Sequence, residues 1–254
     1  MVSFDLTGKT AIVTGGSRGL GVELSTTLAE YGANVAVMAT NMERLETAAK
    51  ELEGKTGRKV LPVQVRVEDE QSVRAAVDKV MREFGKIDIL VNNAGVIRYG
   101  EIDQISLEDW NAVMNIDLTG TFLMSKAVAN AYMKEHGGRI VNISSVNGKR
   151  AMGKAGVYNV AKAAVIALTE FCACNWAPYG IYVNSVAPGY MLNGEMASGV
   201  SEESQERLKR VIPQNRCGQY GDLSGAVLYL ASDACSYTQG VTIVCDGGMI
   251  VKGY

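Results

Sequence analysis

Short apolar runs rich in β-branched residues alternate with longer amphipathic segments along almost the whole chain. Runs that are apolar throughout are typical of strands in a parallel sheet covered on both faces. Strands that alternate with helices form right-handed β-α-β units. The sequence therefore predicts a Rossmann-type doubly wound parallel sheet of seven strands, with helices on both faces. The predicted strands are 9–14, 34–39, 60–65, 87–91, 139–143, 181–186 and 241–244, and the predicted helices are 19–31, 42–53, 70–84, 107–134, 158–176 and 222–231.

Residues 1–254 are expected to form a single domain, because no linker, repeat or low-complexity tract divides the chain. The least regular part is 188–218, which follows a predicted strand and contains glycines, Met191, Leu192, Met196 and a charged helix near 201–210. Ligands of doubly wound sheets bind beyond the carboxyl ends of the strands. We therefore predict that 188–218 forms a substrate lid, the alternative being an ordinary surface excursion.

Composition excludes several classes of function. The net charge of −2 provides no basic surface for nucleic acid and no polybasic patch for a membrane. Five cysteines without C-x-x-C spacing indicate free thiols, and a single histidine, His136, argues against a histidine-based metal site or a Ser-His-Asp triad, so no metal is expected. The N-terminus has no signal-peptide pattern, and no run approaches the ~20 apolar residues of a membrane span. A cytoplasmic protein is expected.

A glycine-rich turn, Thr-Gly-Gly-Ser-Arg-Gly-Leu-Gly over residues 14–21, lies between the first predicted strand and the first predicted helix. Glycines permit a tight turn and let the backbone approach a pyrophosphate, while the helix N-terminus supplies N–H donors. The spacing G-x-x-x-G-x-G is one residue longer than G-x-G-x-x-G. At this junction the turn predicts a dinucleotide-binding site.

The end of the second predicted strand bears on the choice between NAD and NADP. An acidic residue there binds the ribose 2′-hydroxyl of NAD and repels a 2′-phosphate. This chain has Ala39-Thr40-Asn41 instead, and Arg18 in the glycine-rich turn can reach the same region. The pattern favours NADP(H), with NAD(H) as the alternative. Arg18 would otherwise be a solvated side chain.

Tyr158 and Lys162 stand four residues apart at the start of a predicted helix, downstream of Ser144 and Ser145. Residues at i and i+4 share one helix face, and an ammonium group favours a neighbouring phenolate over the phenol, whose ordinary pKa is about 10. A serine hydroxyl can hold the substrate oxygen. This set predicts acid–base chemistry on a carbonyl or an alcohol, although Tyr-x-x-x-Lys alone is common on helices.

Other polar and small residues follow predicted strand ends. Gly15, Asn92, Ser145 and Pro188 are expected to converge on one cleft, because parallel strands end at the same edge. Asn115 lies on the long predicted helix. We interpret it as a buried residue that holds a water behind Lys162, the alternative being a core hydrogen-bonding residue.

These motifs together resemble the single-domain short-chain dehydrogenases/reductases over essentially the whole chain. The matching pieces are 14–21, 92–95, Asn115, Ser145 thirteen residues before Tyr158, Lys162, 188–189 and 246–248. The resemblance implies that Tyr158 is the general acid in reduction and the base in oxidation, and that Lys162 lowers its pKa and binds the nicotinamide ribose. It implies that Ser145 orients the substrate oxygen and that Asn115 anchors a water in a proton relay. The hydride chemistry would belong to the cofactor.

The resemblance also implies a cofactor site that begins at the glycine-rich turn. Its residues would be Gly15, Ser17, Arg18, Gly19, Leu20, Gly21, Thr40, Asn41, Val67, Asn93, Ala94, Gly95, Tyr158, Lys162, Pro188, Gly189, Met191 and Asn193. Two positions depart from the family. Arg66 stands where an aspartate usually contacts adenine, and an arginine could stack on the base instead. Asn193 stands where a threonine usually meets the nicotinamide carboxamide, and it can make the same hydrogen bond.

The predicted substrate site comprises Arg98, Ser145 and Tyr158. Arg98 follows Asn-Asn-Ala-Gly-Val-Ile, and it could pair with a carboxylate at the cleft mouth. Within the family this stretch is similar to the branch that acts on sugar acids, such as gluconate 5-dehydrogenase and deoxygluconate dehydrogenase. Lys149, Arg150 and Lys154 add positive charge nearby. A sugar acid, polyol or ketose is therefore predicted, while 3-oxoacyl, steroid and other hydrophobic ketones stay open.

Two other classes of function compete with an enzyme of this kind. One is a regulator that binds NADPH without chemistry; the other is a sugar-nucleotide epimerase or dehydratase on a similar sheet. The family further implies a homotetramer in which the long helix and the Tyr158 helix pack against partners. The candidate contacts are Phe122, Met124, Phe171 and Trp176.

Overall fold

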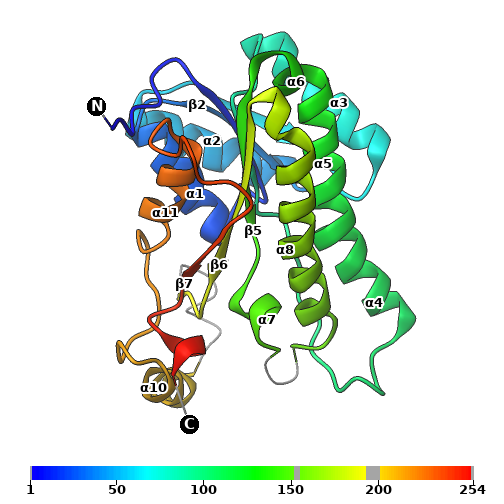
Figure 1. Cartoon of the computed structure of the whole chain (residues 1–254), viewed down its shortest axis with the longest axis vertical. Coiled ribbons are helices and arrows are strands. Elements are labelled where there is room, and N and C mark those ends of the chain that lie inside the picture. Colours follow the sequence, from blue (N-terminus) through cyan, green and yellow to red (C-terminus); the bar gives the residue numbers. More distant parts are fainter. Residues whose placement is uncertain (1, 152–154, 193–200, 253–254) are drawn as a thin grey trace.

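The computed structural model describes residues 2–151, 155–192 and 201–252, and it confirms the predicted sheet. Seven parallel strands are arranged in the order β3-β2-β1-β4-β5-β6-β7 (Figure 1). The strands are β1 (Thr10–Thr14), β2 (Asn34–Ala39), β3 (Val60–Gln64), β4 (Ile89–Asn92), β5 (Gly138–Ile143), β6 (Ile181–Pro188) and β7 (Thr242–Cys245). The order reverses between β1 and β4, which is where ligands of such sheets bind.

Successive strand residues point to opposite faces of the sheet and enter two separate apolar cores. In β1, Ala11 and Val13 face one core, whereas Ile12 faces the other. In β4, Ile89 and Leu90 divide in the same way. Both faces need apolar residues, which explains why the strands are apolar throughout rather than alternating.

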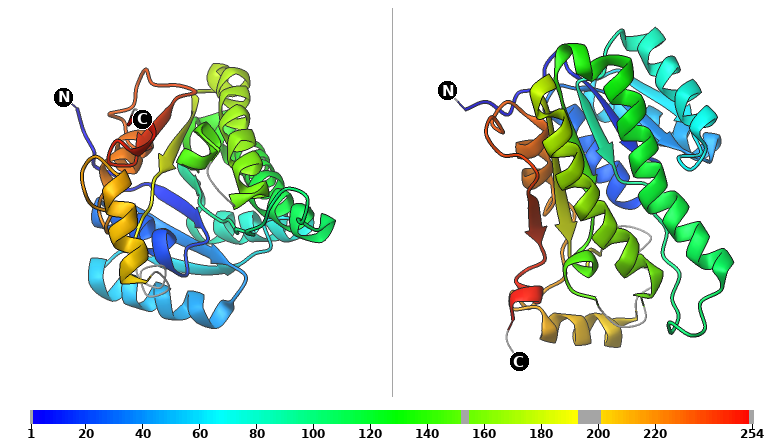
Figure 2. Two further views of the ribbon diagram at one scale, coloured as in Figure 1. Left: turned by 90° about the horizontal axis from the view of Figure 1, so that it is seen from below. Right: turned by 45° about the vertical axis from the view of Figure 1, so that its right-hand side comes forward.

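Helices cover both faces (Figure 2). The first face carries α1 (Gly19–Glu30), α2 (Met42–Thr56) and α11 (Ser224–Ala231), which contribute Leu24, Leu45 and Val227 to its core. The second face carries α3 (Glu70–Phe84), α5 (Gly120–Val128) and α8 (Val157–Trp176), which contribute Val77, Met124 and Cys172. Met124 and Trp176 therefore pack in the core, whereas Phe122 and Phe171 are exposed.

Local signals explain where α2 and α3 begin and end. Asn41 caps α2 by accepting a hydrogen bond from the Arg44 N–H, and Asp69 caps α3 through the N–H groups of its first turn. Each helix ends at a glycine in the left-handed conformation, Gly57 and Gly85. Glycine accepts this conformation without the steric penalty of a Cβ atom.

The long predicted helix 107–134 occupies 107–136 but is not a regular α-helix. It consists of α4 (Leu107–Val113), the π-helix η1 (Met114–Thr119), α5, the π-helix η2 (Ala129–Met133) and α6 (Lys134–His136). At the first π segment the Gly120 N–H donates to the Asn115 carbonyl, five residues back. Such π segments inside helices are frequent at functional sites.

Several short elements were absent from the sequence prediction. They are α7 (Val146–Lys149) and the 3₁₀-helices η4 (Ala177–Tyr179) and η5 (Met249–Val251). The charged helix expected near 201–210 is α10 (Glu202–Val211). In the described part of the chain, one segment, Val157–Tyr179, is long and apolar enough to cross a bilayer, with a mean hydropathy of 1.4. It packs on β6 and α7, as the core helix of a soluble protein also would.

The carboxyl ends of the strands lie at the lower edge in Figure 1, near α7 and α10. Thr14, Asn92, Ile143 and Pro188 end their strands at this edge. The strands β1, β4, β5 and β6 therefore end at the same edge of the sheet, and the predicted site residues that follow them lie there.

Candidate active site

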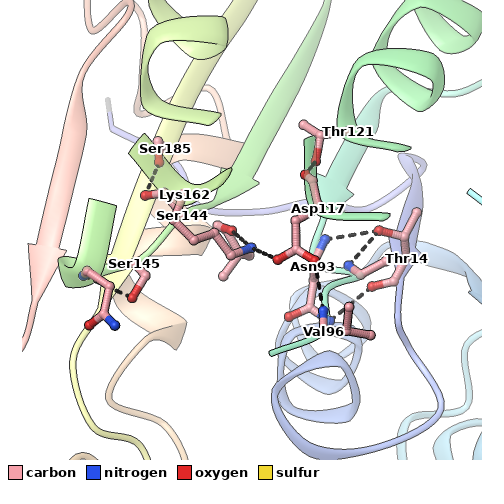
Figure 3. A network of polar contacts seen from close by, with 12 residues as sticks. Thr14, Asn93, Val96, Asp117, Thr121, Ser144, Ser145, Lys162 and Ser185 are labelled. Atoms are coloured by element: carbon pink, nitrogen blue, oxygen red, sulfur yellow. Dashed lines mark hydrogen bonds and ion pairs between the residues drawn. The ribbon is translucent and has the colours of Figure 1, made fainter. Parts of the chain in front are cut away.

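Thr14, the last residue of β1, joins the first strand to the segment that follows β4 (Figure 3). Its hydroxyl accepts hydrogen bonds from the Asn93 and Ala94 N–H groups, each at 3.0 Å. The Asn93 side chain returns a hydrogen bond to the Thr14 carbonyl at 3.0 Å. This reciprocal set fixes the two strand ends at the point where the strand order reverses. Asn93 and Ala94 thus border the predicted cofactor site.

The glycine-rich turn is closed too tightly for side chains. Gly15 has a φ of +66°, and a Cβ atom at Gly21 would lie 2.0 Å from the Gly15 carbonyl oxygen. A Cβ at Gly19 would meet no atom within 4 Å, so the outer side of the turn is open where α1 begins. A compact turn with an open face at a helix N-terminus fits the pyrophosphate of a dinucleotide. Ser17 lies in the same turn, and Leu20 lies in the first turn of α1.

The turn also contacts the end of β2. The Gly16 N–H donates to the Met38 carbonyl at 3.1 Å, which places Arg18 and Thr40 on neighbouring loops, both exposed. The side-chain oxygen of Asn41 is engaged as the cap of α2. No acidic residue occurs between Met38 and Met42, so this end of the site carries no carboxylate in the strand–helix turn.

The end of β3 lines the same edge. Val67 is buried and packs so closely on Gly120 that a Cβ atom there would lie 2.6 Å from its Cγ2. Arg66 is exposed and forms an ion pair with Glu68, Nε to Oε1 at 3.3 Å. Val67 is thus buried after the end of β3, and Arg66 has a carboxylate partner on its own loop.

Lys162 is almost completely buried, with 4% of its surface exposed, although it carries an ammonium group. Its Nζ donates to the Ile143 carbonyl at the end of β5 at 3.0 Å and lies 5.4 Å from the centre of the Tyr158 ring. Tyr158 itself is half-buried. The amine and the phenol ring are therefore neighbours, as their spacing on α8 predicted.

Asp117 is the residue that sequence reasoning missed. Its side chain is fully buried; Oδ2 lies 3.1 Å from Lys162 Nζ, and Oδ1 accepts a hydrogen bond from the Val96 N–H at 2.8 Å (Figure 3). The interpretation of Asn115 as a buried residue behind Lys162 is wrong. Asn115 is exposed, because it lies two residues away on another face of the helix. The spacing Val113, Asp117, Thr121 could have revealed the inward face.

Burial and neighbouring charge shift the pKa of Lys162 in opposite directions. Burial alone lowers the pKa of the amine, whereas the Asp117 carboxylate and Tyr158 raise it. The net pKa of Lys162 lies above its ordinary value, so the side chain is an ammonium ion at neutral pH. Gly95 leaves space for the pair, since a Cβ atom there would lie 2.8 Å from Asp117 Oδ2.

The two adjacent serines have different surroundings. The Ser144 hydroxyl lies 2.6 Å from that of Ser185 and donates to the Val186 carbonyl, which engages it within the sheet. Ser145 caps α7, where its Oγ accepts a hydrogen bond from the Asn147 N–H at 3.1 Å. A hydroxyl that accepts in this way keeps its own proton available for a ligand. The geometry therefore distinguishes Ser145 from Ser144.

The segment that follows β6 is held by backbone contacts to Cys245 and Gly218. The Gly189 N–H donates to the Cys245 carbonyl, and Met191 pairs with Gly218, whose N–H donates to the Tyr190 carbonyl at 2.8 Å. Asn193 and Met196 lie outside the described residues. Met191 is buried, and Leu192 packs with Leu208 of α10 in a small apolar cluster.

Arg98 lies on the loop after β4 and is exposed. Its Nε is 3.3 Å from Asp109 Oδ1 on α4, so the predicted substrate-binding guanidinium has a partner in the protein. Lys149 is exposed, and Arg150 reaches the Ile250 carbonyl at 3.5 Å. Lys154 falls outside the described ranges.

The cysteines are free thiols, as predicted. Burial raises the pKa of Cys172 to about 11, which keeps that thiol protonated and unreactive. Within 2–151, 155–192 and 201–252, no group of three His, Cys, Asp or Glu side chains lies close enough together to hold a metal ion.

A buried ammonium lies beside a phenol, a serine hydroxyl lies near the same strand ends, and a compact glycine-rich turn lies at the N-terminus of α1. A profile described as enoyl-(acyl carrier protein) reductase matches residues 15–250. The chain belongs to the short-chain dehydrogenase/reductase family.

Three similar proteins show how far the likeness extends. The 2-dehydro-3-deoxy-D-gluconate 5-dehydrogenase of Dickeya dadantii is 38% identical, with 98% of each chain covered. The 3-oxoacyl-(acyl-carrier-protein) reductase of Aquifex aeolicus is 37% identical, with 96% of this chain and 98% of that protein covered. A gluconate 5-dehydrogenase from Burkholderia cenocepacia, solved in complex with NADP and tartrate, has a TM-score of 0.94 and 35% identity, with 99% of each chain covered.

These likenesses establish a short-chain dehydrogenase/reductase and hence an oxidoreductase. The chain is similar to relatives that are named for sugar acids and also to one named for acyl thioesters. Family membership therefore leaves the choice of substrate to the residues at the cleft.

Proposed function

We propose that this short-chain dehydrogenase/reductase is an NADP(H)-dependent oxidoreductase of a secondary alcohol and its ketone. The observation that carries the proposal is the contact between a buried ammonium, Lys162, and the ring of Tyr158, with Nζ 5.4 Å from the ring centre. NADP(H), when bound, supplies or accepts the hydride. The cradle formed by Gly15, Gly19 and Gly21 would hold its pyrophosphate.

The protein's own residues handle the proton and the substrate oxygen. Tyr158 gives its phenolic proton to the carbonyl oxygen during reduction and takes the alcohol proton during oxidation. Ser145 donates a hydrogen bond to the same oxygen and so orients it. Lys162 stabilises the phenolate by its charge and would contact the nicotinamide ribose. Asn93, Ala94, Gly95, Pro188, Gly189 and Met191 would complete the wall around the cofactor.

We propose NADP(H) rather than NAD(H), because the turn after β2 carries Thr40 and Asn41 and no carboxylate. Arg18, exposed on the adjacent turn, supplies positive charge for a 2′-phosphate. The Burkholderia gluconate 5-dehydrogenase was solved with NADP, which supports the preference. Titration of the protein with NADPH and NADH is expected to show tighter NADPH binding, and Arg18→Ala is expected to remove most of the difference. Equal or tighter NADH binding contradicts the preference.

We propose a sugar acid, polyol or ketose as substrate. Support comes from the similarity to the deoxygluconate and gluconate 5-dehydrogenases and from Arg98 on the loop after β4. The carboxylate of a sugar acid would replace Asp109 as the partner of Arg98. A reductase of 3-oxoacyl thioesters is the second candidate, favoured by the similarity to the Aquifex enzyme and by buried Met191.

The decisive test is an absorbance screen with NADP(H), in both directions, over sugar acids, polyols, ketoses, 3-oxoesters and steroids. On the substrate that this screen finds, Tyr158→Phe is expected to lower kcat by about 10²–10⁴-fold, the usual contribution of general acid–base catalysis. Tyr132→Phe, at a partly buried tyrosine that packs on the second core, is the matched control and should keep kcat within a few-fold. A Tyr158→Phe variant that turns over at the wild-type rate contradicts the mechanism.

A protein that binds NADPH tightly and converts none of these compounds would instead support a regulator without catalysis.

We further propose a single domain with a lid formed by 188–218, a cytoplasmic location and a homotetramer. Exposed Phe122 on α5 and Phe171 on α8 supply apolar surface for contacts between subunits. Sedimentation of the wild type and of Phe171→Glu tests the assembly; a wild-type monomer contradicts it.

A further inference from the structure

Asp117 places a second charge directly behind the proposed proton donor. The carboxylate is fully buried on η1, its Oδ2 3.1 Å from Lys162 Nζ, and Lys162 in turn lies 5.4 Å from the Tyr158 ring centre. Oδ1 is held by the Val96 N–H at 2.8 Å. The three ionisable groups thus form a row, carboxylate, ammonium and phenol, in which only the phenol is half-buried.

The surroundings of this row supply backbone rather than further charge. β5 contributes the Ile143 carbonyl to Lys162, the loop after β4 contributes the Val96 N–H to Asp117, and α7 packs Gly148 against the backbone of Lys162. The titratable groups that act on the ammonium are Asp117 from η1 and Tyr158 from α8. Among the described residues, Lys162 is the cation that forms an ion pair with Asp117.

We propose that Asp117 is a positioning residue that holds Lys162 in place, offsets its charge and thereby sets the pH range in which Tyr158 exchanges its proton. The inference rests on the proposed function, in which Tyr158 is the proton donor. Lys162 alone would present a net positive charge to the phenolate, which strongly favours ionisation. Paired with a carboxylate 3.1 Å away, it presents a nearly neutral pair, so Tyr158 ionises at a higher pH than it would beside the lysine alone.

Asp117→Asn tests this charge effect with almost no change in shape. The amide oxygen can still accept from the Val96 N–H, and the Ile143 carbonyl still holds the lysine. Tyrosinate absorbance is titrated in the wild type and in the variant, each corrected by its own Tyr158→Phe counterpart so that the difference reports Tyr158. The midpoint is expected to fall by about 1 pH unit or more, since one unit charge a few ångströms beyond the lysine is removed.

The same shift is expected in the pH–rate profile of alcohol oxidation, whose rising limb should move to lower pH. A merely structural role would change stability or rate without moving the midpoint. Asp78→Asn, the same change at an exposed site on α3, is the matched control and should leave the midpoint unchanged. An unchanged midpoint in Asp117→Asn, or a rise caused by loss of the lysine proton, overturns the proposal.

The absorbance titration separates this inference from the proposed function, because it needs no substrate. A shifted midpoint in a protein without turnover would keep the charge effect and remove the oxidoreductase mechanism. If Asp117→Asn fails to fold, the single variant Lys162→Gln is compared with the double variant Lys162→Gln/Asp117→Asn. The double variant leaves no buried charge unpaired. The double variant should ionise Tyr158 at the lower pH, and equal midpoints in the two proteins overturn the proposal.

Discussion

The floor of the site, formed by Thr14, Asn93, Asp117 and Lys162, and its rim, represented by Arg98 and Asp109, are built in different ways. In the floor, each polar group is at least half-buried and bonded to a different strand end or loop. In the rim, Arg98 and Asp109 are about half-exposed and form an ion pair with each other, Nε to Oδ1 at 3.3 Å. Exposed pairs of this kind contribute little to stability.

The difference matters because the proposed function gives the two regions different tasks. A cradle for a dinucleotide and a proton donor would need fixed geometry, and burial with hydrogen bonds and an ion pair provides it. Selection of a substrate needs surface groups that can exchange one partner for another. Relatives named for sugar acids and for acyl thioesters share 37–38% identity with this chain over nearly its full length, which fits a common floor with different rims.

The largest effect is expected from a side chain in the floor where none fits. In Gly21→Ala the Cβ atom would lie 2.0 Å from the Gly15 carbonyl oxygen, so the turn must open and lose its cradle geometry. NADPH affinity, measured by fluorescence titration, should fall by about 100-fold or more, as expected when a binding group moves by ~1 Å. Gly54→Ala on α2, where the new Cβ meets nothing within 4 Å, should bind NADPH normally. Normal binding by Gly21→Ala would show that the turn does not hold the cofactor.

A comparison of Ser144 and Ser145 tests which of the two adjacent hydroxyls contacts the substrate. Ser145→Ala removes the hydroxyl that orients the substrate oxygen and should lower kcat by about 100-fold. Ser144→Ala removes a hydrogen bond within the sheet and should reduce the free energy of unfolding by about 1 kcal/mol, with kcat within a few-fold. Steady-state kinetics and urea unfolding of both variants measure the two effects. The reverse order of kcat losses would assign the substrate contact to Ser144.

Substitutions in the rim should change KM rather than kcat. Arg98→Gln is expected to raise KM for a sugar acid by about 10-fold, because a charge-assisted pair with the carboxylate is lost. KM for a neutral polyol should stay the same, and the unfolding free energy should change by less than about 0.5 kcal/mol. Equal KM changes for the acid and the polyol would exclude Arg98 from carboxylate recognition.

The smallest expected effect is the dependence of stability on alkaline pH. The pKa of Lys162 is raised in the folded protein above its unfolded value of about 10.4, so its stabilising contribution is complete below pH ~10.4 and is lost as the pH rises through the folded pKa. The wild type should therefore lose stability relative to Asp117→Asn above pH ~10.4. Urea unfolding of the two proteins at pH 9 and above measures this, and a constant difference between them would contradict it.

Much of the fold was readable because local patterns and global architecture agree. The apolar run 87–91 predicted a buried parallel strand, which is β4, and the amphipathic segment 70–84 predicted α3, because these periods follow from strand and helix geometry alone. The glycine-rich turn was equally readable, since only glycine permits the close approach between Gly21 and Gly15.

The sequence by itself determined the order of strands and helices, the position of the cradle and the pairing of Tyr158 with Lys162, because each depends on residues close together in the chain. Only the tertiary structure decided that Asp117, and not Asn115, faces Lys162. The two residues are separated by two positions on a π-helical turn, and which one faces inward depends on how that turn packs against α8 and the loop after β4. The spacing of Val113, Asp117 and Thr121 indicates one buried helix face, but only packing brings that face against a residue 45 positions away.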